Sequence, residues 1–207
     1  MRTVRYAVTA LALVAAGSAQ AFGIGVRAGS TGLGADVAWD LAPTLSARLG
    51  YSGGKVGYDV DTDQVRYDGD VKLSNLNALL DFAPLGPLFR ISGGVIFNEN
   101  KYDVRGTPAN GGPGALTGTV KSGKSAAPYL GIGYGRVSGT GVNFYADLGV
   151  IFQGTPSATL TADCTGLNAG QCSTLQGAVA AEQQRLQDEL KNFKYYPVLN
   201  IGLTIGF

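Results

Sequence analysis

Apolar residues occupy every second position in eight separate segments of the chain. In the last segment, leucine, isoleucine and finally Phe207 alternate with asparagine, threonine and glycine. Strict alternation of this kind predicts β-strands that each have one apolar face. The eight segments lie at residues 22–30, 33–40, 45–51, 75–82, 89–98, 128–134, 142–152 and 199–207.

The second face of these strands differs from the solvent face of a soluble sheet, where lysine and glutamate dominate. It is rich in glycine and also carries polar residues and a balanced set of charges. Small groups and balanced charge suit a narrow enclosed interior, because a buried charge must be paired. The pattern therefore predicts an all-β fold, an eight-stranded antiparallel transmembrane β-barrel with lipid on its apolar face. We expect the lumen, as a channel or as a plug, to be lined by Arg27, Asp36, Arg48, Asn77, Asp81, Arg90, Asn143, Tyr145, Asp147 and Asn200.

The connections between the predicted strands are of unequal length. Three of them, near residues 42–43, 84–87 and 138–141, are short and are assigned to the periplasmic side. The external links comprise a tight turn at 30–32, a moderate link around 59–68, loop three at about 101–125 and loop four at about 154–194. Short inner turns with longer outer loops are typical of outer-membrane barrels.

The N-terminal 21 residues have the pattern of a secretory signal peptide. Arg2 and Arg5 precede an apolar run over residues 6–16, and the segment ends in Ala19-Gln20-Ala21. That run is about half the ~20 residues that a membrane-spanning helix needs. We therefore expect a leader at 1–21, export through the periplasm, and a mature barrel at 22–207.

Composition supports a β-rich, non-enzymatic membrane protein. Glycine accounts for 32 of 207 residues, and the chain has ten tyrosines, eight phenylalanines and one methionine. The chain has no histidine, which excludes Ser-His triads and the commonest metal ligand. Asp36 and Asp147 have the chemistry of an acid–base pair, but we favour counter-ions to the lumen arginines. No catalytic residue, metal or cofactor is expected, and without the leader the nearly neutral charge argues against nucleic-acid binding.

Loop four contains the only two cysteines, Cys164 and Cys172. Because the chain matures in an oxidising compartment, a local disulfide is predicted. Leu186, Leu190 and Phe193 follow at helical spacing, so a helix is predicted over residues 174–193. The sequence leaves open whether this loop packs on itself or folds over the barrel mouth as a lid.

Several segments together resemble the CarO-type outer-membrane proteins. The most specific are "APYLGIGYG" (Ala127–Gly135) and "FQGTPSATLT" (Phe152–Thr161), and "LSNLNALLDFAPLG" (Leu73–Gly86) adds to them. The resemblance spans most of the predicted mature chain. It implies an eight-stranded barrel in the outer membrane of a Gram-negative bacterium, linked to passage of small solutes, notably basic amino acids and some β-lactams.

Two functions remain open from the sequence. The first is a narrow channel or uptake protein for small solutes such as basic amino acids, which the resemblance favours. The alternative is a closed structural barrel whose external loops mediate surface interaction or adhesion. The expected partners are outer-membrane lipid and lipopolysaccharide, small solutes, and the outer-membrane assembly machinery, for which Phe207 resembles the terminal recognition signal; a monomer is expected.

Overall fold

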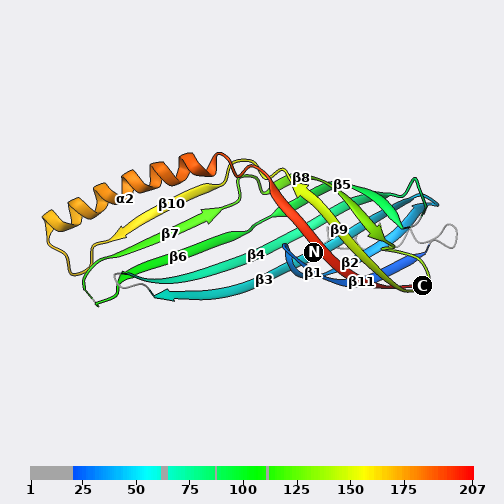
Figure 1. The fold of residues 1–207 in the computed structure, drawn as a ribbon, viewed down its shortest axis with the longest axis horizontal. Helices are drawn as coiled ribbons and strands as arrows, with labels where there is room; N and C mark the ends of the chain where they lie inside the picture. The colour runs from blue at the N-terminus through cyan, green and yellow to red at the C-terminus, as the bar shows by residue number, and fades with distance from the viewer. Residues whose placement is uncertain (1–20, 62–64, 87, 111) are drawn as a thin grey trace, which may run out of the picture.

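The computed structural model describes residues 21–61, 65–86, 88–110 and 112–207. Apart from Ala21, the predicted leader lies outside the described residues. The described chain forms one antiparallel sheet that is closed at one end and open at the other, with a long helix beside the open end (Figure 1).

Eight described strands close a ring, which confirms the antiparallel eight-stranded prediction. Along the ring they are β1 (Phe22–Gly29), β2 (Gly32–Ala42), β3 (Leu45–Asp61), β4 (Val65–Phe82), β5 (Phe89–Asn98), β8 (Ala126–Gly135), β9 (Gly141–Ile151) and β11 (Tyr196–Gly206). Each strand pairs with the next, and β11 closes the ring against β1 with Leu203 opposite Val26.

The outside of the ring is an apolar surface. Along β11, every second residue from Leu199 to Phe207 is exposed, and the residues between them are buried. Leu203 is 50% exposed and Phe207 is 71% exposed. An outward band of large apolar side chains around a polar interior is the arrangement of a barrel in lipid. No helix in the described ranges is both long and apolar enough to cross a membrane.

Glycines on the inner face make room for the large side chains that cross the lumen. The ring of Tyr145 lies directly over Gly202, so a Cβ at that position would overlap the ring. A Cβ at Gly133 would lie 2.5 Å from Cζ of Arg90. The glycine-rich face therefore packs against bulky side chains and does not leave a wide pore.

The sheet continues beyond the ring as an extension that the sequence pattern did not predict. β3 and β4 have 17 and 18 residues, more than the 9–11 or so that cross a bilayer. The outer half of β4 pairs with β6 (Lys101–Pro108) as well as with β3. β6 then pairs with β7 (Ala115–Lys121), and β7 pairs with β10 (Ser157–Asp163), which gives the order β3–β4–β6–β7–β10. Residues 101–125 and 154–194, expected as external loops, thus contain three strands and a helix (Figure 1).

The two faces of the sheet exchange polarity where the extension begins. On β3, Arg48 and Ser52 point into the lumen, and Val56 continues on the same face because it lies an even number of residues further along. Cross-strand register extends this apolar inner face to Val71, Tyr102 and Val120. The outward face, apolar around the ring, carries lysine, aspartate, arginine and threonine in the extension.

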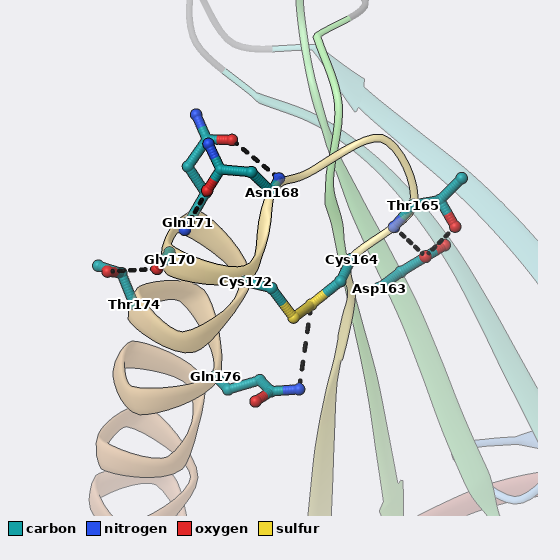
Figure 2. Close-up of a disulfide and its surroundings, with 9 residues drawn as sticks. All are labelled: Asp163, Cys164, Thr165, Asn168, Gly170, Gln171, Cys172, Thr174 and Gln176. Carbon is teal, nitrogen blue, oxygen red and sulfur yellow. Dashed lines mark hydrogen bonds between the residues drawn. A yellow bond between two sulfur atoms is a disulfide. The ribbon is translucent and has the colours of Figure 1, made fainter.

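Helix α2 (Ala169–Leu190) starts five residues earlier than predicted because Asn168 caps it. The Asn168 side chain accepts a hydrogen bond from the backbone of Gln171, whose own side chain accepts one from the Asn168 backbone. Cys164 and Cys172 form the predicted disulfide, which joins the end of β10 to the first turns of the helix (Figure 2).

The helix lies along β10 and not over the ring (Figure 1). The side-chain oxygen of Gln187 accepts a hydrogen bond from the backbone of Ala158 at 3.1 Å, and that of Gln183 accepts one from Leu160 at 2.9 Å. The two glutamines are four residues apart, a rise of about 6 Å along the helix, and the two backbone donors are two residues apart, about 6.6 Å along the strand. The spacing of the glutamine side chains therefore matches the spacing of the donors. The glutamines thus satisfy backbone groups at the sheet edge, which would otherwise offer a template for pairing.

Candidate functional site

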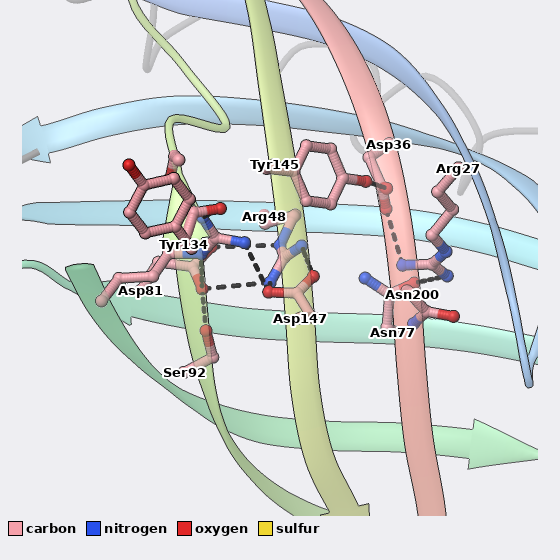
Figure 3. A network of polar contacts seen from close by, with 12 residues as sticks. Arg27, Asp36, Arg48, Asn77, Asp81, Ser92, Tyr134, Tyr145, Asp147 and Asn200 are labelled. Carbon is pink, nitrogen blue, oxygen red and sulfur yellow. Dashed lines mark hydrogen bonds and ion pairs between the residues drawn. The ribbon is translucent and has the colours of Figure 1, made fainter. Parts of the chain in front are cut away.

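The lumen holds a network of three arginines and three aspartates (Figure 3). Arg48 lies at its centre and is 1% exposed. Its Nη1 donates to Oδ2 of Asp147 at 2.6 Å, and its Nη2 donates to Oδ1 of Asp81 at 3.1 Å. Arg90 donates to Asp147 as well and lies 3.5 Å from Asp81. The carboxylates on β4 and β9 are therefore each shared by two guanidinium groups.

Tyr145 joins this cluster to a second ion pair. Its hydroxyl donates to Asp36, which also accepts a hydrogen bond from Nη1 of Arg27 at 2.9 Å. The guanidinium groups of Arg48 and Arg90 lie 5.4 and 5.3 Å from the centroid of the Tyr145 ring, within cation–π range. Arg27 reaches Asn77 as well, so side chains from neighbouring and opposite strands form one connected network.

The structure brings nine of the ten residues predicted to line the lumen to its inside. Arg27, Asp36, Arg48, Asn77, Asp81, Arg90, Tyr145, Asp147 and Asn200 are all buried there. Asn143 lies on the same inward face, two residues before Tyr145 and opposite the buried Thr204, but it is only partly buried, and its amide donates to the carbonyls of Gly139 and Gly141 in the β8–β9 turn. Asn143 therefore helps to shape a turn.

A buried apolar cluster, which was not predicted from the sequence, fills the lumen on the side of the charges that faces the extension. It consists of Leu79, Ile96, Ala127, Tyr129, Ile151 and Val198, with Tyr196 packed against it. A signal was present, because pairs such as Leu79-Leu80 and Ile151-Phe152 break the alternation with an apolar residue at an inward position. The lumen thus contains an apolar layer whose residues are absent from the predicted set of lumen-lining residues.

A small cavity lies inside the ring. This cavity, between the charge network and the apolar cluster, has a volume of about 10 Å³, close to the minimum that holds one water molecule. Further out, Asn75 donates to the Thr31 carbonyl and to Asn100, and Asn98 donates to Gln153. An amide layer therefore fills the lumen toward the extension.

The opposite end of the lumen is filled by the β8–β9 turn. Val137 of this turn is buried against Ala38 and Tyr145. The neighbouring Ser138 donates a hydrogen bond from its hydroxyl to Asp40. The interior is consequently packed at both ends as well as in the middle.

A larger space lies outside the ring, between the tip of the extension and α2. This groove has a volume of about 730 Å³. One wall is the inner face of the sheet, including Tyr67 and Leu116, and the other is the first half of the helix, including Leu175 and Ala178. The disulfide holds that half of the helix to β10. The groove is an apolar concave surface on an ordered scaffold, as ligand sites commonly are.

The outward face of the extension is polar and carries paired charges. Asp103 accepts hydrogen bonds from Nζ of Lys101 at 2.9 Å and from the hydroxyl of Thr119 at 2.7 Å. These two donors hold the pKa of Asp103 below its ordinary value. The face is thus stabilised by charge-assisted contacts between neighbouring strands.

The geometry gives no acid–base pair. Asp36 and Asp147 each serve as a counter-ion to arginine, as the counter-ion interpretation of the sequence holds. Within the described ranges, no group of three or more cysteine and carboxylate side chains is arranged to hold a metal ion. What the arrangement offers chemically is a filled, ion-paired interior and an open external groove.

Comparisons with known proteins agree with this fold. No protein-family model and no curated protein matches the chain. A crystal structure of Acinetobacter baumannii CarO2 matches with a TM-score of 0.64 at 18% identity, covering 92% of this chain and 100% of that one. A crystal structure of A. baumannii CarO matches with a TM-score of 0.64 at 22% identity, covering 89% and 97%. A major outer membrane protein from Thermus thermophilus is more distant, with a TM-score of 0.47 at 18% identity, covering 92% and 100%. The chain therefore has the fold of a CarO-type small outer-membrane barrel.

Proposed function

We propose that this protein is an outer-membrane barrel that is closed to solutes and whose external sheet and helix act at the cell surface. The observation that carries the proposal is the filled lumen, whose cavity of about 10 Å³ contrasts with an external groove of about 730 Å³. The apolar outer band and the likeness to CarO structures support a position across the outer membrane.

Permeation would require the charge network to break. Arg48 contacts Asp81 and Asp147, and Tyr145 lies against Arg48 and Arg90, so a path would have to separate several buried groups at once. Exposing an unpaired charge inside a low-dielectric interior costs several kcal/mol per ion. A stiff, closed barrel is therefore the state that this geometry favours.

Flux through reconstituted protein tests the closed state. Liposomes that contain the wild-type barrel should take up arginine and glycine no faster than empty liposomes. An Arg48→Ala/Tyr145→Ala variant removes the two central side chains and serves as the control that flux is detectable. Wild-type uptake above the empty-liposome rate would overturn the closed state.

The groove can be tested separately in whole cells. Leu175→Arg and Ala178→Arg place charge in the groove, whereas Gly177→Arg on the same helix has open space around it and serves as the matched control. Adhesion of cells to octyl-coated beads should fall for the groove variants and stay unchanged for the control. Equal adhesion by all four strains, at equal surface amounts, would contradict a surface role for the groove.

Uptake of small basic solutes is the second candidate. It is favoured by the three lumen carboxylates, Asp36, Asp81 and Asp147, which already bind guanidinium groups. An incoming cationic amino acid would compete with these arginines for the same carboxylates. Arginine uptake that exceeds glycine uptake in the flux experiment would select this candidate.

A further inference from the structure

Four lysines form a row across the outward face of the extension. Lys55 of β3 lies opposite Lys72 of β4, Lys72 lies opposite Lys101 of β6, and Lys101 lies opposite Lys121 of β7. Like charges directly opposite one another on neighbouring strands are destabilising. The fold itself does not need four lysines in this arrangement. We therefore expect negative charge close to them that offsets their repulsion.

The protein supplies only part of that counter-charge. Asp70 lies 3.5 Å from Lys55, and Asp103 lies 3.6 Å from Lys72 and 2.9 Å from Lys101. Within the described ranges, Lys121 makes no ion pair. Two carboxylates thus face four ammonium groups, and the lysines remain open to an external anion.

The position of the row identifies the source of that anion. The last exposed apolar residues of the outer band are Tyr51 on β3 and Leu76 on β4, and each lies four residues from the lysine on its strand. Four strand residues span about 13 Å, which is about 9 Å along the membrane normal at a tilt near 45°. A bilayer carries roughly 5–7 Å of headgroup region outside each edge of its hydrocarbon core. Flexible lysine side chains at this height reach the headgroup phosphates.

We propose that the lysine row, defined as Lys55, Lys72, Lys101 and Lys121, binds the phosphate groups of an outer-leaflet glycolipid. The inference rests on the proposed position across the outer membrane. The row lies on the strands of one wall only and faces outward, so it forms a local lipid site beside the barrel. A bound headgroup phosphate supplies the missing counter-charge and thereby steadies the base of the extension.

The same face provides a matched control. Arg66 and Arg105 also point outward but lie further toward the tip, where Arg66 pairs with Asp61 at 2.7 Å and Arg105 with Asp163 at 3.8 Å. Arg66 is six residues beyond Lys72, about 20 Å further along the strand. Removing these two arginines changes the net charge by the same amount as removing two lysines of the row, but leaves the charges at the level of the headgroups unchanged.

The test compares Lys72→Gln/Lys121→Gln with Arg66→Gln/Arg105→Gln. The lysine pair is chosen because it leaves the closer contact between Lys101 and Asp103 intact. Purified, heat-modifiable proteins in micelles are titrated with diphosphorylated lipid A, and bound lipid is counted by native mass spectrometry. The lysine variant should bind about tenfold more weakly than wild type, whereas the arginine variant should match wild type.

Two further probes identify which chemical group the lysine row binds. Dephosphorylated lipid A should bind weakly to all three proteins, and inorganic phosphate should neither be retained nor displace the lipid at millimolar concentration. Equal lipid binding by the lysine variant and wild type, an equal loss in the arginine variant, or displacement by free phosphate would each overturn the proposal. Failure of the barrel to fractionate with outer membranes would instead refute the proposed location, so the two failures can be distinguished.

Discussion

Arg48 of β3 donates a hydrogen bond across the full width of the ring to Asp147 of β9, with Nη1 2.6 Å from Oδ2. These strands are four positions apart in either direction around an eight-stranded ring, so no wider crossing exists. Both side chains are almost completely buried. One buried ion pair therefore ties opposite walls of the ring together across the lumen.

Replacing Arg48 with methionine should strongly destabilise the barrel. The Arg48→Met change leaves Asp81 and Asp147 with only part of their counter-charge, and breaking a buried pair in this way costs about 3–5 kcal/mol. The double variant Arg48→Met/Asp147→Leu removes one charge of each sign and should lose less. Urea unfolding in micelles, followed by the fluorescence of Trp39, measures both. A single variant no less stable than the double would contradict the proposed charge balance.

The glutamines of α2 should protect the edge of the extension. In Gln183→Ala/Gln187→Ala the backbone amides of Ala158 and Leu160 lose their acceptors, each worth about 0.5–1.5 kcal/mol. Those two amides should exchange with solvent faster, and the protein should self-associate more readily through the freed edge. Hydrogen exchange and sedimentation measure the two effects.

Gln184→Ala is the matched control for the edge because Gln184 is exposed on the same helix. It should leave exchange at both amides unchanged. Exchange accelerated by Gln184→Ala as much as by the double variant would contradict protection of the edge by Gln183 and Gln187.

The ring was predictable because its cause is local in the sequence. Alternation along β11 depends on neighbouring residues alone, and antiparallel closure of β11 on β1 follows once the strand number is even. The extension was not predictable in this way. The segment "TPANGGPGALTG" is typical of a loop, yet β6 ends and β7 begins inside it. They become strands because the outer half of β4 offers an edge to β6, and β6 in turn pairs with β7.

The lumen was predictable as a set of residues but not as a set of contacts. Alternation assigned Arg27, Arg48 and Arg90 to the inside, yet their partners depend on the stagger of strands across the ring. Alternation placed Leu79 and Tyr129 on the inner face, but Ile96 and Ile151 lie in apolar runs where the period-two pattern assigns no face, so the cluster was not predicted.

Acidification should loosen the extension before the ring. Lys101 and Thr119 hold the pKa of Asp103 below its ordinary value. The Asp103 carboxylate therefore contributes its full stabilisation above its pKa in the unfolded chain, about 3.9, and this stabilisation is lost as the pH falls toward its lower pKa in the folded protein. Protection factors of β6 and β7 amides should therefore fall as the pH drops below about 4. Asp103→Asn should remove this step. An unchanged pH profile in that variant would contradict the assignment to Asp103.

Phe207 should matter for assembly much more than for the stability of the finished barrel. Its backbone closes the seam by donating to the Phe22 carbonyl at 2.9 Å, but its ring is 71% exposed on the outer surface. Phe207→Ala keeps the backbone bonds, so the purified, refolded variant should unfold at nearly the wild-type urea concentration. In cells, the same variant should give less heat-modifiable barrel at an equal rate of synthesis, because we expect the assembly machinery to recognise Phe207 during insertion. Phe144→Ala, an outward aromatic on β9 with 55% exposure, is the control for lost contact with lipid. An equal assembly loss in both variants would assign the effect to lipid contact, and no loss in Phe207→Ala would refute the recognition role.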